Sequence, residues 1–180
     1  PVSNPPPEAV YLRDEETGEI WTPTPLPAGE DAPYLVRHGA GYSSFEYNSH
    51  GLEQKLSAFA DREDPLKVVE LKLRNVWSHR RRITATFYAA WVLGIHRDVE
   101  QQYIVPRYDV ETGALLARNA HSPEFGERVA FLAASQEPHG LTADRMEFLG
   151  RNGDPGRPGG LQRVGLEGNV GAGLDPCAAL

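Results

Sequence analysis

The stretch from Pro65 to Asn75 reads Pro-Leu-Lys-Val-Val-Glu-Leu-Lys-Leu-Arg-Asn, and the stretch from Arg80 to Leu93 reads Arg-Arg-Arg-Ile-Thr-Ala-Thr-Phe-Tyr-Ala-Ala-Trp-Val-Leu. Apolar and polar residues alternate in both stretches, as they do in a β-strand with one face on a core. The connector 76–79 is short enough for an antiparallel hairpin. The arginines at 80–82 are interpreted as a solvated strand start, with a phosphate or partner role as the alternative. We expect these side chains to face one core: Val69, Leu71, Leu73, Ile83, Phe87 and Trp91.

The rest of the chain also predicts strands, because its 18 glycines and 15 prolines fall between short apolar segments. Hairpins are expected around Gly39 and around 111–113, and Pro106 favours an edge strand. Helical and strand patterns both fit Leu52–Ala60, and its neighbours favour a strand. The further strands are expected at Ala32–His38, Gly41–Tyr47, Gln102–Val110, Ala114–Arg118 and Glu127–Ser135. The predicted fold class is all-β, an antiparallel β-sandwich.

Composition limits the classes of function. A chain of 180 residues suits one domain, and a net charge of −7 with a pI near 5.4 argues against nucleic acid as a partner. The single Cys177 excludes an internal disulfide and is expected to be a small buried residue in a cytoplasmic protein. The six histidines lack metal-binding spacing, so no metal site is predicted. Because Pro1 stands where an initiator methionine would, we expect a piece of a longer polypeptide.

The segment Asp144–Asn152, Asp-Arg-Met-Glu-Phe-Leu-Gly-Arg-Asn, is the strongest candidate site. An apolar Phe148–Leu149 pair inside so polar a stretch indicates a loop that is anchored to a core while its polar ends face a ligand. A surface segment with one buried phenylalanine is the alternative. Residues 151–160 are rich in glycine and proline and predict an exposed loop.

Two further places carry aromatic and basic side chains. Trp21 lies in a proline-rich stretch, where its indole could stack on a sugar ring; the alternative is that it caps the core. Arg37, His38 and Tyr42 surround two glycines and suit sugar or phosphate contacts. The alternative there is a tight hairpin in which Arg37 pairs with a carboxylate.

Three separated motifs resemble glycoside hydrolase family 94. They are Tyr-Leu-Arg-Asp-Glu-Glu-Thr-Gly-Glu-Ile-Trp-Thr-Pro-Thr-Pro at 11–25, Arg-His-Gly-Ala-Gly-Tyr at 37–42, and Asp-Arg-Met-Glu-Phe-Leu-Gly at 144–150. The family includes cellobiose and chitobiose phosphorylases and the carboxy-terminal part of bacterial cyclic β-1,2-glucan synthases. The ending at 171–180 is most similar to the glucan-synthase branch. The resemblance implies a galactose-mutarotase-like super-sandwich, incomplete at its start and end, that precedes an (α/α)6 barrel in such enzymes.

The resemblance also implies a reaction for the parent enzyme. In inverting phosphorolysis, phosphate attacks one face of the anomeric carbon while a carboxylic acid protonates the leaving oxygen on the other. In family members the barrel supplies that acid, so the isolated chain is expected to be a non-catalytic, carbohydrate-binding segment. No cofactor is expected, and inorganic phosphate or a sugar 1-phosphate would be the parent's co-substrate. The expected partners are a β-glucan oligosaccharide, the rest of the parent polypeptide and a second copy in a homodimer, with inner-membrane anchoring of the parent as an alternative location.

By position in the family motif, Arg145, Arg151 and Asn152 would contact the sugar on the acceptor side of an active site across the dimer interface. Asp144 would then orient Arg145, and pairing of Arg151 with Asp154 is the structural alternative. For the whole chain, the alternative function is a stand-alone sugar-binding or assembly β-sandwich that takes no part in turnover.

Overall fold

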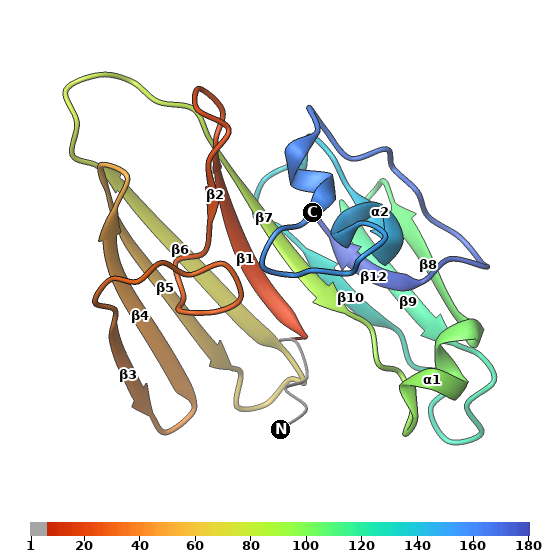
Figure 1. Ribbon diagram of the computed structural model, residues 1–180. Coiled ribbons are helices and arrows are strands. Elements are labelled where there is room, and N and C mark those ends of the chain that lie inside the picture. The colour runs from red at the N-terminus through yellow and green to blue at the C-terminus, as the bar shows by residue number, and fades with distance from the viewer. Residues whose placement is uncertain (1–6) are drawn as a thin grey trace. The chain divides into compact units, whose positions relative to one another are not determined.

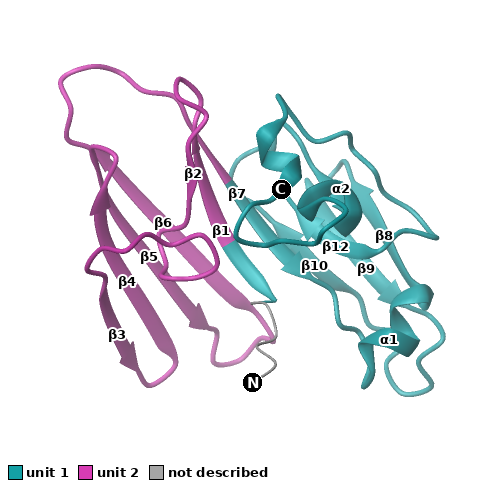
Figure 2. Cartoon of the chain, viewed as in Figure 1, with its two compact units in different colours: residues 1–9, 86–180 teal, residues 10–85 magenta. Residues whose placement is uncertain are grey.

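A computed structural model describes residues 7–180 and consists mainly of strands in antiparallel sheets, with a few short helices (Figure 1). The all-β antiparallel prediction is therefore confirmed. One domain was expected, and the chain divides into two compact units, residues 1–9 with 86–180 (unit 1) and residues 10–85 (unit 2) (Figure 2). Strands β1 (Glu8–Asp14) and β7 (Ile83–Ala90) contribute residues to both units.

Unit 2 contains a four-stranded antiparallel meander in the order β3-β4-β5-β6. A two-residue turn at His50 and Gly51 joins β4 to β5, and both residues have positive φ, 52° and 68°, as primed hairpin turns require. The four strands are β3 (Leu35–Gly39), β4 (Tyr42–Ser49), β5 (Leu52–Ala60) and β6 (Lys67–Asn75). The predicted hairpin around Gly39 and the strand assignment of Leu52–Ala60 are confirmed.

The core of unit 2 lies between this meander and the pair formed by β1 and β2 (Ile20–Trp21), in which Leu12 faces Trp21. Leu12 and Trp21 are buried against Tyr47 and Leu52 of the meander. The other face of the meander, opposite Tyr47 and Leu52, is thus left on the outside of unit 2.

Unit 1 contains the sheet β10-β9-β8, formed by β10 (Ala130–Ala133), β9 (Ala114–Asn119) and β8 (Ile104–Asp109). The hairpin between β8 and β9 confirms the turn predicted at 111–113, and β8 is an edge strand, as Pro106 indicated. A second group of strands places β12 (Pro176–Ala179) between β11 (Thr142–Asp144) and the end of β7. The buried cluster between the two groups contains Leu115, Ala143, Ala178 and Leu180.

Short helices complete unit 1. They are α1 (Arg97–Glu100), α2 (Arg145–Leu149) and the 3₁₀ helices at Gln101–Tyr103 and Gly159–Gln162. Among residues 7–180, no helix has the length and apolar composition needed to cross a membrane.

The predicted hairpin between 65–75 and 80–93 is wrong. Strand β6 pairs with β5, whereas β7 pairs with β12 at the far end of the sequence. Consecutive residues Tyr88 and Ala89 of β7 are both buried, so this strand is covered on both faces. The alternation of apolar and polar residues in β7 therefore does not mark a solvent-exposed face.

The single core expected for six side chains of these strands is also wrong. Leu71 and Ile83 pack on the cluster of unit 2, Trp91 packs on the cluster of unit 1, and Leu73 keeps 36% of its surface exposed. The interpretation of 80–82 as a solvated start fails for Arg81, whose side chain is 3% exposed and pairs with Asp14.

Candidate functional site

The segment Asp144–Asn152 begins as a short helix and not as a loop. Strand β11 ends at Asp144, whose extended backbone and carboxylate form the N-cap of α2; Oδ1 accepts a hydrogen bond from the Met146 amide at 2.9 Å. Phe148 and Leu149 are buried, and the Phe148 ring stacks on Tyr88 with ring centroids 4.8 Å apart. The predicted anchoring by Phe148 and Leu149 is therefore confirmed.

Glu147 is a buried carboxylate that ties α2 to the segment after the loop. Its oxygens accept hydrogen bonds from the Thr142 hydroxyl at 2.5 Å, the Asn169 amide group at 2.8 Å and the Glu167 backbone N–H at 2.7 Å. Three donors on one buried carboxylate satisfy most of its acceptor positions. Glu147 therefore holds the structure of the site.

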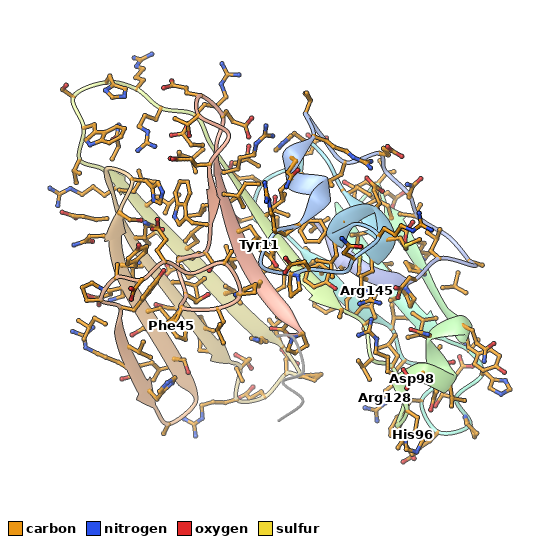
Figure 3. All side chains as sticks on the ribbon, viewed as in Figure 1. Tyr11, Phe45, His96, Asp98, Arg128 and Arg145 are labelled. Atoms are coloured by element: carbon orange, nitrogen blue, oxygen red, sulfur yellow. The ribbon has the colours of Figure 1, made fainter. Side chains whose placement is uncertain are left out.

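Arg145, labelled at α2 in Figure 3, is oriented by Asp175 and not by Asp144. Its Nε donates to Asp175 Oδ2 at 2.8 Å, and its backbone N–H donates to the Asp175 carbonyl at 2.8 Å. The other oxygen of Asp175 lies 3.7 Å from Nη2 of Arg97. The Asp144 carboxylate instead caps α2 through Oδ1.

Sequence reasoning missed Asp175 and Arg97. They lie 30 and 48 positions from Arg145 (175 − 145 and 145 − 97), and no local spacing connects the three. The pairing of β11 with β12 brings Asp175 to the start of α2. The only local signal for Asp175 is its place just before the buried strand Pro176–Ala179.

Arg151 and Asn152 lie on the surface where the chain leaves α2. Gly150 ends the helix with φ 84°, a value that favours glycine, and its N–H donates to the Met146 carbonyl at 3.0 Å. Both following side chains are exposed, and no ion pair of Arg151 occurs among residues 7–180. Asp154 does not pair with Arg151: its Oδ1 accepts from the Gly156 amide at 2.8 Å.

The loop predicted at 151–160 is exposed over its first part and packed at its end. Pro158 and Gly160 are buried, and a Cβ on Gly160 would lie 3.1 Å from the Phe148 backbone. The loop therefore leaves α2 and returns to it, which fixes both ends while the residues between them remain in solvent.

The hairpin of β3 and β4 carries the other basic and phenolic candidates. Arg37 Nη1 lies 2.7 Å from Glu46 Oε1, the ion pair that the structural alternative foresaw, and the Arg37 side chain is still 51% exposed. His38 Nδ1 is 2.9 Å from the Ser43 hydroxyl across the hairpin. Tyr42 is 50% exposed. Arg37 and Tyr42 project from one face of the sheet and His38 from the other, because side chains alternate along a strand.

Trp21 lies in the core of unit 2 with 1% of its surface exposed. Its Nε1–H donates to Gln54 Oε1 at 2.8 Å, and its ring stacks on His50 with centroids 4.0 Å apart. A ring and an N–H that are both satisfied inside the protein leave no surface for a sugar. The structure therefore favours the core alternative for Trp21.

The described residues offer little chemistry of their own. Residues 7–180 contain no group of three or more His, Cys, Asp or Glu side chains placed to hold a metal ion. The Cys177 thiol is fully buried, as expected; burial and the nearby carboxylates of Asp144 and Asp175 raise its pKa far above the usual value, so it stays protonated. What the site presents is a set of fixed hydrogen-bonding side chains.

The whole sequence, residues 1–180, matches the family model described as "Glycosyl hydrolase 94, supersandwich domain". Over 181 aligned residues it is 35% identical to the cyclic beta-(1,2)-glucan synthase NdvB of Rhizobium meliloti (strain 1021), and this alignment covers 99% of the chain and 6% of that protein. It is 30% identical over 167 residues to a solabiose phosphorylase of Paenibacillus borealis, covering 90% of the chain and 22% of that enzyme. An N,N'-diacetylchitobiose phosphorylase of Vibrio furnissii is 26% identical over 156 residues, which is 83% of the chain and 20% of that enzyme. The chain thus spans less than a quarter of the length of each of these relatives.

Proposed function

The chain belongs to the glycosyl hydrolase 94 supersandwich family, and on this premise we propose that it is the non-catalytic, carbohydrate-binding part of a phosphorylase or glucan-synthase type of enzyme that acts on β-glucans. In this proposal, α2 and the loop after it contribute to the acceptor side of the parent's active site. The family match and the similarity to a glucan synthase and to phosphorylases support the enzyme class.

The observation that carries the site is the contrast between the anchor and the residues after it. Phe148 is fully buried, while Arg151 and Asn152, three and four positions later, are exposed on a loop fixed at both ends. A guanidinium and an amide held in this way can donate to several hydroxyl or phosphate oxygens at once. Arg145 is held by Asp175 and keeps part of its side chain exposed, so it offers a pre-oriented donor at the start of α2.

The parent reaction follows from the chemistry of phosphorolysis. Inorganic phosphate, or a sugar 1-phosphate in the reverse direction, is the co-substrate, and one carboxylic acid outside this chain protonates the leaving oxygen. The isolated chain neither consumes nor releases phosphate. The parent works as a homodimer in which this loop meets the active site of the second copy, in the cytoplasm or at the cytoplasmic side of the bacterial inner membrane.

The test is Arg151→Ala in the full-length parent enzyme, with Arg157→Ala as the matched control. Both arginines are exposed and lie in the same loop. We expect Arg151→Ala to lower kcat/KM for the acceptor about tenfold to a hundredfold, roughly 1.4–2.8 kcal/mol, because a charge-assisted hydrogen bond to the sugar is lost. Arg157→Ala should stay within about twofold of the wild type.

Acceptor kinetics that are unchanged in Arg151→Ala would reject the acceptor-side assignment. If both variants also leave phosphate turnover unchanged, the chain acts in assembly or in sugar binding away from turnover. Equal losses in the two variants would indicate a general effect of loop charge and not a contact of Arg151.

A further inference from the structure

The outer face of the sheet β3–β6 is a second surface with an unusual distribution of side chains. We define this face by the side chains opposite the buried Tyr47, Leu52 and Leu56. The register of the four strands puts the following residues on it in order along the strands: Gly39, Tyr42, Phe59 and Val68; then Arg37, Ser44, Ser57 and Glu70; then Leu35, Glu46, Lys55 and Lys72; then Asn48, Glu53 and Arg74.

One end of this outer face is aromatic. Tyr42 and Phe59 are direct cross-strand partners and are 50% and 41% exposed. The Tyr42 ring lies over Gly39, where an added Cβ would come 2.1 Å from a ring carbon. The absence of a side chain at Gly39 therefore leaves room for the Tyr42 ring over β3. Two exposed rings on neighbouring strands offer aromatic surface of the kind on which the C–H face of a sugar ring can stack.

The remaining rows of the outer face are polar and are held by ion pairs. Glu46 Oε1 lies 2.7 Å from Arg37 Nη1 and 3.2 Å from Lys55 Nζ, and Glu53 Oε2 lies 3.0 Å from Arg74 Nη1. The hydrogen bond from Lys55 holds the pKa of Glu46 below its usual range, so this carboxylate stays an acceptor at neutral pH. Exposed pairs of this kind add little stability, but they fix the positions of donors and acceptors.

The last two polar rows line a shallow hollow of about 430 Å³ over β4, β5 and β6. The outward side chains in its lining are Glu46, Asn48, Glu53, Lys55, Lys72 and Arg74. From the aromatic row to the last polar row the strands advance six residues, roughly 20 Å. That length accommodates several linked sugar rings.

The charge of the outer face selects among possible occupants. Arg37, Lys55, Lys72 and Arg74 carry four positive charges, and Glu46, Glu53 and Glu70 carry three negative charges. A face so nearly balanced has no net attraction for a polyanion such as nucleic acid or for a cation. Alternating donors and acceptors suit hydroxyl groups, which both donate and accept. An uncharged polyhydroxyl chain therefore matches both the polar rows and the aromatic end.

We propose that the outer face of β3–β6 binds a linear neutral oligosaccharide, with one sugar stacked on Tyr42 and Phe59 and the following sugars hydrogen-bonded along the hollow. This site goes beyond the proposed function, because it lies in unit 2 and uses none of the residues of α2 or its loop. It would hold a glucan chain without taking part in bond cleavage.

The experiment is titration of the full chain with a β-1,2-linked glucose hexasaccharide and with cellohexaose, followed by calorimetry and by amide chemical shifts of β4 and β5. We expect binding of at least one hexasaccharide and much weaker binding of glucose. Tyr42→Ala and Phe59→Ala should each raise Kd at least about tenfold. Phe131→Ala is the matched control, because Phe131 is also an exposed aromatic residue on a strand, at 53%, and should leave Kd within twofold.

Further variants separate the outcomes. Tyr42→Phe keeps the ring and should bind within about threefold of the wild type, while Glu53→Gln keeps the side-chain shape and should weaken binding if the hollow is used. Arg151→Ala should not change Kd, so failure here and failure of the acceptor-side proposal are distinguishable. The proposal is overturned if neither hexasaccharide binds at millimolar concentration, if Tyr42→Ala and Phe131→Ala bind equally, or if only an anionic probe such as polyphosphate shifts the amides of β4 and β5.

Discussion

The sheet β3–β6 and the strands around β12 are held together in different ways. In the first, each strand pairs with the next in the sequence, and Ser49 faces Leu52 across a two-residue turn. In the second, Ala89 faces Ala178 and Thr142 faces Ala179. Pairing across a short turn closes a small loop, whereas pairing across half the chain requires distant segments to be ordered first. The second region therefore depends more on buried side chains that hold its segments together.

The two regions also expose different surfaces. The meander has one face on the core of unit 2 and leaves the other face in solvent with its rows of charged and aromatic side chains. Around α2, the polar residues of the motif are mostly consumed by the structure, as caps or as buried hydrogen bonds. Part of the Arg145 side chain and the loop that begins at Arg151 are left exposed. The segments around β12 are distant in the sequence and use their polar groups to hold one another in place. The sheet β3–β6 pairs neighbouring strands and leaves many of its polar groups in solvent.

The largest effect is expected from Phe148→Ala. The ring has no exposed surface and stacks on Tyr88, so its removal leaves a cavity where α2 meets the strands. We expect the free energy of unfolding to fall by about 3–5 kcal/mol, measured by urea denaturation. Phe131→Ala, on an exposed ring of β10, is the control and should cost less than about 0.5 kcal/mol. Similar losses in both would mean that α2 is not anchored by Phe148.

The next effect concerns the buried ion pair of unit 2. Asp14 and Arg81 are 2% and 3% exposed, and the same guanidinium also donates to the His50 carbonyl. Asp14→Asn leaves the positive charge of Arg81 buried without its counter-ion, and we expect a loss of about 3 kcal/mol in urea denaturation. Glu53→Gln removes the carboxylate of the exposed pair with Arg74 and should cost less than about 1 kcal/mol.

The pair of Asp14 and Arg81 also predicts a pH dependence with a definite sign. Burial alone would raise the pKa of Asp14, but hydrogen bonds from Arg81 and from the amides of Glu16 and Thr17 outweigh it and lower the pKa below 3.8. The contribution of this carboxylate is fully present above its ordinary pKa of 3.8 and is lost as the pH falls through the lowered value. Asp14→Asn should therefore flatten the fall of stability below pH 4. If stability still falls as steeply below pH 4 in Asp14→Asn as in the wild type, carboxylates other than Asp14 cause that fall.

Sequence patterns predicted well those features that depend on residues close together in the chain. The alternation of apolar and polar residues and the turn residues predicted the hairpin at Gly39 and the strand 52–60, and Pro106 predicted an edge strand. Each of these features depends on residues that are neighbours in the chain. The pairing of β7 failed, since alternation says which residues share a face and does not say which strand lies beside it.

The candidate site shows the same limit. The buried Phe148 could be inferred from an apolar residue in a polar stretch, and so could the exposure of Arg151 after a glycine. The partner of Arg145 could not, because Asp175 reaches it only through the pairing of β11 and β12. Burial of Arg81 was missed for the same reason: its partner Asp14 lies 67 positions away (81 − 14).

The smallest effect is expected from Asp144→Ala, which tests whether the start of α2 needs its cap. Asp144 and Asp154 make the same hydrogen bond, each from a carboxylate to the backbone N–H two residues ahead, at 2.9 and 2.8 Å. The first bond satisfies the Met146 amide at the start of a helix that is buried at its other end, whereas the second lies in an exposed loop. We expect Asp144→Ala to lower the free energy of unfolding by about 1 kcal/mol in urea denaturation, the usual cost of an N-cap. Asp154→Ala should cost less than about 0.5 kcal/mol, because loop residues in solvent lose little when one bond is replaced by water. Equal costs for the two would show that α2 takes no special stability from its cap, and that burial of Phe148 and Leu149 alone fixes where the loop with Arg151 begins.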